Sequence, residues 1–161
     1  MKKGLILGRF QPFHLGHLTL IKNVINDNFE PLICIGSSQE ERTKENPFTK
    51  LERRKMIESV LKPLECNYQI YGIPDINNYD LYVLHLTSLV PSFDVIYSGN
   101  SLVKRLFTKA GHKVIVPEII NREAWEGASI RQAILKDDNW ERDVPVSVAK
   151  IISGIDIALL S

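Results

Sequence analysis

Near its N-terminus the chain reads Gly4-Leu5-Ile6-Leu7-Gly8-Arg9-Phe10-Gln11-Pro12-Phe13-His14-Leu15-Gly16-His17. Residues 4–8 form a short apolar run closed by glycine, which is typical of a strand buried on both faces. Residues 15–25 carry apolar side chains at helical spacing. The amides at the start of such a helix favour an anion, Gly8 and Gly16 leave room for it, and Arg9 adds a permanent positive charge. The junction between this strand and this helix is therefore a candidate phosphate site.

The same alternation of strand and helix continues along the chain. Further apolar runs predict buried strands at residues 31–36, 67–73, 94–97 and 112–116. Helical patterns follow at residues 50–61, 79–89, 102–110 and 128–136, and a last helix starts near Pro145. This order predicts an α/β fold of three layers with a five-stranded parallel sheet, whose ligands bind beyond the carboxyl ends of the strands.

Three local signals mark the ends of these elements. Thr49 and Glu52 have the spacing of a capping box, which makes residues 37–48 a long polar loop before the helix. Gly111 is placed to end the helix over residues 102–110. Residues 117–127 show no regular pattern and predict a second irregular stretch.

Length and composition exclude several classes of protein. The chain has 161 residues, with 20 Lys and Arg residues against 19 Asp and Glu residues, for a formal net charge of +1. We expect a single domain over residues 1–161. A balanced charge argues against a nucleic-acid binder, and no apolar stretch approaches the ~20 residues of a membrane span, so a cytoplasmic protein is expected. The two cysteines suggest neither a disulfide framework nor a zinc site.

Charge is segregated along the chain despite the balanced total. Residues 1–26 contain four basic side chains and no acidic one, whereas residues 63–103 contain four acidic side chains and no basic one. This pattern fits either solvated helix faces or an anion site near the first strand.

His14 and His17 stand three residues apart at the start of the first predicted helix, so both rings can lie along one side of it. Three interpretations of the pair stay open. The rings can ligate a metal, although no third ligand is evident nearby, or they can be structural and bind loop carbonyls. They can also hold the oxygens of a phosphoryl group through their N–H donors while charge moves toward a leaving group.

The decapeptide from Gly8 to His17 resembles the HxGH signature of the nucleotidylyltransferase superfamily, in the form typical of archaeal-type nicotinamide mononucleotide (NMN) adenylyltransferases. Further blocks that resemble the same family follow in order at residues 46–53, 73–82, 93–107 and 127–131. The resemblance runs from about residue 4 to residue 145. It implies a Rossmann-like nucleotidylyltransferase fold.

The resemblance also implies a reaction and a set of site residues. In this family the 5′-phosphate of NMN attacks the α-phosphorus of ATP and yields NAD and pyrophosphate, with Mg²⁺ carried by ATP and no covalent enzyme intermediate. The implied catalytic residues are His14, His17, Arg9 and Arg131. The implied ATP contacts add Gly8, Phe10, Gly127 and Ser129 to these four. The family usually has a hydroxyl where this chain has Ala128, which leaves open whether Ser129 replaces it.

For NMN, the resemblance implies that Asp75 accepts a hydrogen bond from the carboxamide and that Tyr82 stacks on the pyridinium ring. Tyr82 can also be an ordinary ring of an amphipathic helix, and Trp125 can close the pocket instead. Ser98, Gly99 and Asn100 follow the fourth predicted strand and are candidate NMN contacts, or a plain turn.

Alternative functions and roles stay open beside this one. The same reaction can use another acceptor, namely nicotinate mononucleotide, phosphopantetheine or FMN, and a noncatalytic nucleotide sensor is a more distant alternative. The basic side chains around the long polar loop can hold pyrophosphate or only solvate the surface; they are Arg42, Lys44, Arg53 and Arg54. The resemblance further implies a homo-oligomer.

Overall fold

The computed structural model describes residues 1–118 and 125–161. Its five strands are β1 (Lys3–Gly8), β2 (Glu30–Gly36), β3 (Gln69–Ile73), β4 (Val95–Tyr97) and β5 (Val114–Ile115). They form one parallel sheet in the order β3-β2-β1-β4-β5. The predicted α/β fold with a five-stranded parallel sheet is confirmed.

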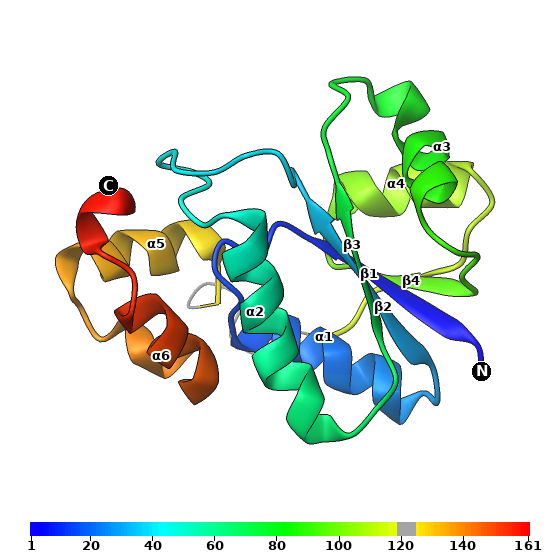
Figure 1. Ribbon diagram of the computed structural model, residues 1–161. Coiled ribbons are helices and arrows are strands. Elements are labelled where there is room, and N and C mark those ends of the chain that lie inside the picture. The colour runs from blue at the N-terminus through cyan, green and yellow to red at the C-terminus, as the bar shows by residue number, and fades with distance from the viewer. Residues whose placement is uncertain (119–124) are drawn as a thin grey trace.

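Helices cover both faces of this sheet (Figure 1). On one face lie α1 (Leu15–Asn26) and α2 (Lys50–Leu61), and α6 (Val146–Ser153) packs against α2. Helix α5 (Gly127–Lys136) adds side chains to the core on the same side. On the other face lie α3 (Tyr79–Leu89) and α4 (Ser101–Lys109). The described residues also form three short 3₁₀ turns, at Lys62–Leu64, Trp140–Asp143 and Ile157–Leu159.

Alternate residues of each central strand enter two separate cores. Leu5 and Leu32 pack with the side chains of α3 and α4, whereas Ile6 and Ile33 pack with those of α1, α2, α5 and α6. All four side chains have no exposed area. Because both faces are covered, these strands appear in the sequence as continuous apolar runs.

The order of the strands sets the place of the site. The chain moves from β1 outward to β2 and β3, then crosses back to β4 on the other side of β1. The connections therefore leave β1 and β4 in opposite directions and open a crevice at their carboxyl ends. Gly8, the last residue of β1, lies at this point.

The local signals in the sequence are largely confirmed. Thr49 and Glu52 form the predicted capping box, and Gly111 has a φ of 88° just after α4. Pro145 is the residue before α6 rather than its first residue. The predicted irregular stretch at 117–127 includes residues 119–124, which lie outside the described residues.

The predicted strands at 67–73, 94–97 and 112–116 are longer than the observed ones. Strand β5 has only two residues, and both pair with β4, which is three residues long. Two of the flanking residues still bond to a neighbouring strand, since the Asp94 amide donates to the Lys3 carbonyl and the Lys113 carbonyl accepts from the Ile96 amide. These single bonds do not extend the strands to the predicted ends. Among the described residues, no helix is both long enough and apolar enough to cross a bilayer.

Candidate active site

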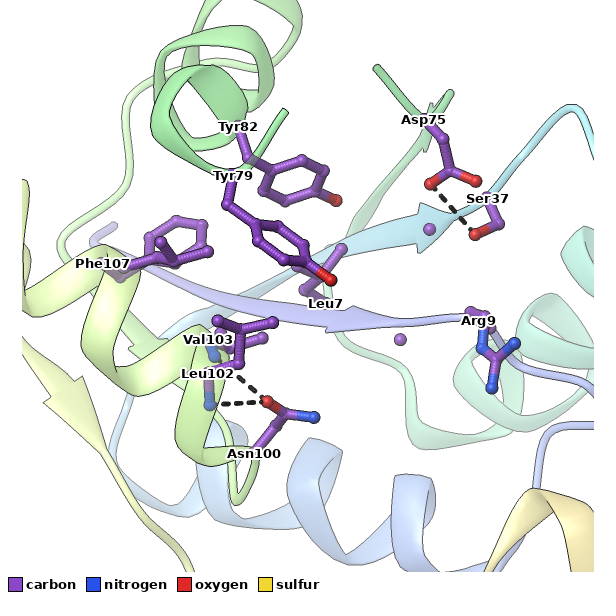
Figure 2. Close-up of a pocket in the computed structure, with 13 residues that line it drawn as sticks. Leu7, Arg9, Ser37, Asp75, Tyr79, Tyr82, Asn100, Leu102, Val103 and Phe107 are labelled. Atoms are coloured by element: carbon purple, nitrogen blue, oxygen red, sulfur yellow. Dashed lines mark hydrogen bonds between the residues drawn. The ribbon is translucent and has the colours of Figure 1, made fainter. Parts of the chain in front are cut away.

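A cleft of about 430 Å³ opens at the carboxyl ends of β1 and β2, next to the starts of α3 and α4 (Figure 2). This volume lies in the range of small-molecule sites. Its lining residues are Leu7, Gly8, Arg9, Gly36, Ser37, Asp75, Tyr79, Tyr82, Asn100, Leu102, Val103, Leu106 and Phe107. Five residues that the sequence singled out thus share one cleft: Gly8, Arg9, Asp75, Tyr82 and Asn100.

The cleft has walls of different chemistry. Figure 2 shows the rings of Tyr79 and Tyr82 reaching in from α3, with Asp75 and Ser37 to one side and Arg9 at the end of β1. An aromatic surface, an anion and a cation therefore lie around one space. Such a site can take a ligand with a flat ring and a phosphate.

Asp75 is held in a fixed orientation by two neighbours. Ser37 Oγ donates to Asp75 Oδ1 at 3.1 Å, and Gln39 Nε2 donates to Asp75 Oδ2 at 3.0 Å. The Asp75 amide in turn donates to Gln39 Oε1 at 3.0 Å. Each carboxylate oxygen accepts one of these bonds and keeps a second lone pair for a ligand.

The two tyrosines differ in their exposure. Tyr82 is partly buried, and burial together with the nearby Asp75 carboxylate raises the pKa of its hydroxyl to about 12. Tyr79 is 65% exposed and stands at the start of α3. Because residues three apart share one side of a helix, both rings reach the same cleft.

His14 and His17 form a reciprocal cap at the start of α1. The Gly16 amide donates to His14 Nδ1 at 3.1 Å, and the His14 amide donates to His17 Nδ1 at 3.1 Å. Since both Nδ1 atoms accept, the proton of each neutral ring resides on Nε2. The two rings are stacked with their centroids 3.8 Å apart. Neither Nε2–H bonds to another of the described residues, so each is a candidate donor to a ligand.

The two glycines of the motif make room for these rings. A Cβ atom at Gly16 would lie 2.8 Å from His14 Cε1, so a side chain there would displace the His14 ring. A Cβ atom at Gly8 would lie 3.3 Å from His17 Nε2. Gly8 therefore keeps the proton-bearing nitrogen of His17 accessible from the cleft.

Both histidines are held in the neutral form. Burial, with the nearby Arg131 cation, lowers the pKa of His14 from its usual 6.5 to about 4. Burial and the adjacent His14 lower the pKa of His17 well below its usual value. Near neutral pH the pair therefore offers hydrogen-bond donors rather than positive charge.

Arg131 approaches this region from the C-terminal part of the chain. Its Nη1 donates to the carbonyl of Gln11 at 2.8 Å, and a Cβ atom at Gly127 would lie 2.8 Å from that nitrogen. Burial, with the nearby Arg9 cation, lowers the pKa of Arg131. The positive charges of Arg9 and Arg131 thus act on each other, which favours a multiply charged anion beside them.

The start of α5 lies beside a second cavity, of about 310 Å³. Glu126 precedes the helix and makes no capping hydrogen bond to it among the described residues. The amides of the first turn therefore lack a side-chain acceptor. The lining residues are Lys44, Glu45, Ala128, Ser129, Arg131, Gln132 and Leu135.

The remaining predicted site residues lie outside the lining of the first cleft. Phe10 is 1% exposed, and its ring centroid lies 4.4 Å from that of His17. Ser98 is buried, and its Oγ accepts from the Asn100 amide at 3.1 Å. Gly99 follows Ser98 in this turn. Trp125 is half-buried, and a Cβ atom at Gly16 would lie 3.5 Å from its Cβ atom.

Asn100, which lines the first cleft, also has a structural task. Its Oδ1 caps α4, so its amide nitrogen is the polar group left for a ligand.

The basic loop residues have separate roles. Arg53 has no exposed area, so the interpretation that it solvates the surface is wrong. Arg42 forms a bidentate pair with Glu52, at 3.0 and 2.8 Å. Arg54 pairs with Glu58 on the exposed side of α2. Only Lys44 of the four lines a described cavity.

Three side chains of the site are not among the predicted site residues: Tyr79, Ser37 and Gln39. Tyr79 stands three residues before Tyr82, and this spacing is a usable signal. Ser37 follows β2, and the rule that neighbouring parallel strands end at the same edge could have found it. Gln39 carries no such signal, because its partner Asp75 is distant in sequence. Gln11 belongs to the quoted decapeptide, but only the structure shows that its side chain holds the backbone of Phe48.

No group of three or more His, Cys, Asp or Glu side chains within residues 1–118 and 125–161 is placed to hold a metal ion. The described part of the site consists of hydrogen-bond donors, arginines, one carboxylate and aromatic rings.

The pKa of His14 predicts a pH dependence of stability. The unfolded chain takes up a proton at this residue near pH 6.5, and the folded chain only near pH 4. Between these values the unfolded state binds more protons, so the free energy of unfolding falls as pH falls. We expect a loss on the order of 1–2 kcal/mol from His14 between about pH 7.5 and about pH 5. Urea titrations of wild type and His14→Gln check this; equal pH slopes in the two proteins would contradict it.

Comparisons with known proteins agree with this geometry. Residues 5–133 match the model of the cytidylyltransferase-like family. The chain is 43% identical over 155 residues to a nicotinamide-nucleotide adenylyltransferase of Picrophilus torridus, covering 96% of this chain and 92% of that relative. It is 44% identical over 160 residues to the enzyme of the same name from Archaeoglobus fulgidus, with the same two coverages.

Solved structures share the fold at lower identity. A bifunctional NMN adenylyltransferase/ADP ribose pyrophosphatase from Francisella tularensis matches with a TM-score of 0.72 and 22% identity, over 95% of this chain and 50% of that one. Its complex with AMP and an Mn ion matches with a TM-score of 0.69. This chain spans about half the length of that bifunctional protein. Because sequence similarity extends over nearly the whole chain at more than 40% identity, the chain belongs to the nicotinamide-nucleotide adenylyltransferase family.

Proposed function

We propose that this protein transfers the adenylyl group of ATP to NMN and forms NAD and pyrophosphate. The observation that carries the proposal is that one cleft joins Arg9 and Gly8, the residue that borders His17, to Asp75 and two tyrosines. A phosphate-binding region and a pocket for a flat polar ring thus lie next to each other. Family membership supports the same reaction.

In the proposed reaction a 5′-phosphate oxygen of NMN forms a bond to the α-phosphorus of ATP. The bond from that phosphorus to the bridging oxygen breaks, and pyrophosphate leaves with the electron pair. No protein nucleophile is required. The protein positions the two substrates in line and stabilises the charge that develops on the phosphoryl oxygens.

The residues at the phosphate end of the cleft have different roles, which follow from the chemistry of their side chains and amides. The Nε2–H groups of His14 and His17 donate to oxygens of the transferring phosphoryl group. Arg9 and Arg131 compensate the negative charge of the triphosphate. The amides of Gly127 and Ser129 at the start of α5 bind the leaving phosphates. The donor substrate is the Mg²⁺ complex of ATP, so the ion arrives with the triphosphate.

The acceptor end fits a nicotinamide ring. The carboxamide of NMN donates to Asp75, whose orientation Ser37 and Gln39 already fix. The face of Tyr82 takes the cationic pyridinium ring. The amide nitrogen of Asn100 donates to a ribose or phosphate oxygen. NMN contacts by Ser98, Gly99 and Trp125 stay predictions, as do a homo-oligomer and a cytoplasmic location.

A purified-protein assay tests the function directly. With ATP, Mg²⁺ and NMN we expect NAD and pyrophosphate in equal amounts. In a panel with nicotinate mononucleotide, FMN and phosphopantetheine, we expect NMN to have the highest kcat/KM. Asp75 repels the carboxylate of nicotinate mononucleotide, and the other two acceptors lack the pyridinium ring with its carboxamide. A higher kcat/KM for another acceptor would overturn the assignment of NMN, and ATP binding without any transfer would support a sensor.

Replacing His17 tests the phosphate end. His17→Ala removes one donor that is preorganised for the transition state, which typically contributes ~3 kcal/mol. We therefore expect kcat to fall by about two orders of magnitude while the dissociation constant for ATP changes much less. The control is His112→Gln, since His112 stacks on Phe93 and lines none of the described cavities. An unchanged kcat in His17→Ala would show that His17 has no role in the transfer step.

Replacing Asp75 tests acceptor selectivity. Asp75→Asn keeps the size of the side chain and removes its negative charge. Because a like charge about 4 Å away at a hydrated site costs on the order of 1–4 kcal/mol, we expect nicotinate mononucleotide to gain about tenfold in kcat/KM relative to NMN. The paired measurement of both substrates with wild type and variant gives this ratio. An unchanged ratio would show that Asp75 does not sense the substituent on the ring.

A further inference from the structure

Arg53 lies in the interior of the protein between the ends of two strands. It projects from α2 and has no exposed area. Its Nη1 donates to the carbonyl of Arg9 at 3.0 Å and to the carbonyl of Gly36 at 3.1 Å. One nitrogen atom therefore joins the chain just beyond β1 to the last residue of β2.

The other guanidinium nitrogens hold the loop that follows β2. Nη2 lies within hydrogen-bond distance of three carbonyls, those of Ser37 at 3.4 Å, Ser38 at 3.3 Å and Glu40 at 3.1 Å. Nε donates to the carbonyl of Thr49 at 3.3 Å. Every hydrogen bond that Arg53 makes with the described residues goes to a backbone carbonyl.

The segment held in this way carries the partners of Asp75. Ser37 and Gln39 donate to the two carboxylate oxygens of Asp75. Arg53 thus contacts the backbone of Arg9 on the phosphate side. On the acceptor side it contacts the backbone of Ser37 and of the two residues that flank Gln39. The rigid, planar guanidinium of Arg53 therefore links the phosphate side of the cleft directly to the acceptor side.

The backbone next to two of these carbonyls has an unusual conformation. Phe10 follows Arg9 with a φ of 54°, and Ser37 follows Gly36 with a φ of 47°. Residues other than glycine rarely adopt this left-handed region and hold it only where the surroundings enforce it. Arg53 binds the carbonyl immediately before each of these residues, which helps to hold both in the left-handed conformation.

We propose that Arg53 is a positioning residue, which sets the distance between the phosphate end of the cleft and Asp75 and so aligns the two substrates for transfer. This inference rests on the proposed function. It assigns Arg53 no contact with either substrate. The alignment matters because a displacement of about 1 Å can cost an enzyme about 10²-fold in rate.

The test compares Arg53→Lys with Arg54→Lys. A lysine keeps the positive charge but replaces the planar five-donor fork by one ammonium group. This group cannot occupy the positions of Nη1 and Nη2 at once, so it cannot bind Arg9 together with the segment of residues 37–40. Arg54 is the next residue of the same helix and pairs with Glu58 on the exposed side. The measurements are kcat, the dissociation constants of ATP alone and of NMN alone, and the fraction of folded protein from thermal unfolding.

We expect Arg53→Lys to lower kcat per folded molecule by about 10²-fold, while each binary dissociation constant changes less than about threefold. We expect Arg54→Lys to match wild type. A kcat per folded molecule equal to wild type would reduce Arg53 to a structural role and overturn the inference. If neither wild type nor Arg54→Lys forms NAD, the proposed function fails instead.

A second variant covers the case in which Arg53→Lys does not fold. Ser37→Ala combined with Gln39→Ala leaves the guanidinium contacts intact and breaks the link from the segment to Asp75. We expect a lower kcat/KM for NMN with an unchanged dissociation constant for ATP. If this double variant retains wild-type kcat and KM for NMN, the segment does not position the acceptor, and the inference is wrong.

Discussion

A buried guanidinium holds together the backbone where the two central strands end. Backbone carbonyl groups just beyond the end of a strand have no hydrogen-bond partner in the sheet. Where they are buried, each needs a donor from elsewhere in the protein. Arg53 supplies these donors from α2 to the ends of β1 and β2 and to the loop beyond β2. Burial lowers the pKa of this arginine, partly offset by the nearby Glu41, and the carbonyl dipoles around it compensate the desolvation of its charge. Arg53 therefore ties the irregular segments beside the cleft to the ends of the two central strands.

The polar side chains of the site use some of their atoms for structure and leave others for a ligand. His14 and His17 use Nδ1 to cap α1, which places the protons on Nε2. Asn100 uses Oδ1 to cap α4 and keeps its amide nitrogen. Asp75 accepts one hydrogen bond on each oxygen from within the protein. Because each group is oriented before a substrate arrives, binding requires little reorganisation.

The fold follows closely from the sequence because its signals are local. The runs at residues 4–8 and 31–36 correspond to strands buried on both faces, and Thr49 with Glu52 marks the start of α2. The strand ends are less accurate, since the length of β5 depends on how many residues of β4 lie opposite it. That number is a property of the sheet and has no signal in the sequence of β5 alone.

The sequence by itself determined the α/β alternation, the strand-to-helix junction and the histidine pair, because each depends on residues within one or two turns of one another. The tertiary structure alone decided that Asp75 meets Ser37 and Gln39, that Tyr79 shares a cleft with Arg9, and that Arg53 is buried. An arginine in a polar, basic stretch has the same local pattern whether it faces water or a ring of carbonyls. Only the packing of α2 against the ends of β1 and β2 removes it from solvent, and the contacts responsible join residues up to 44 positions apart.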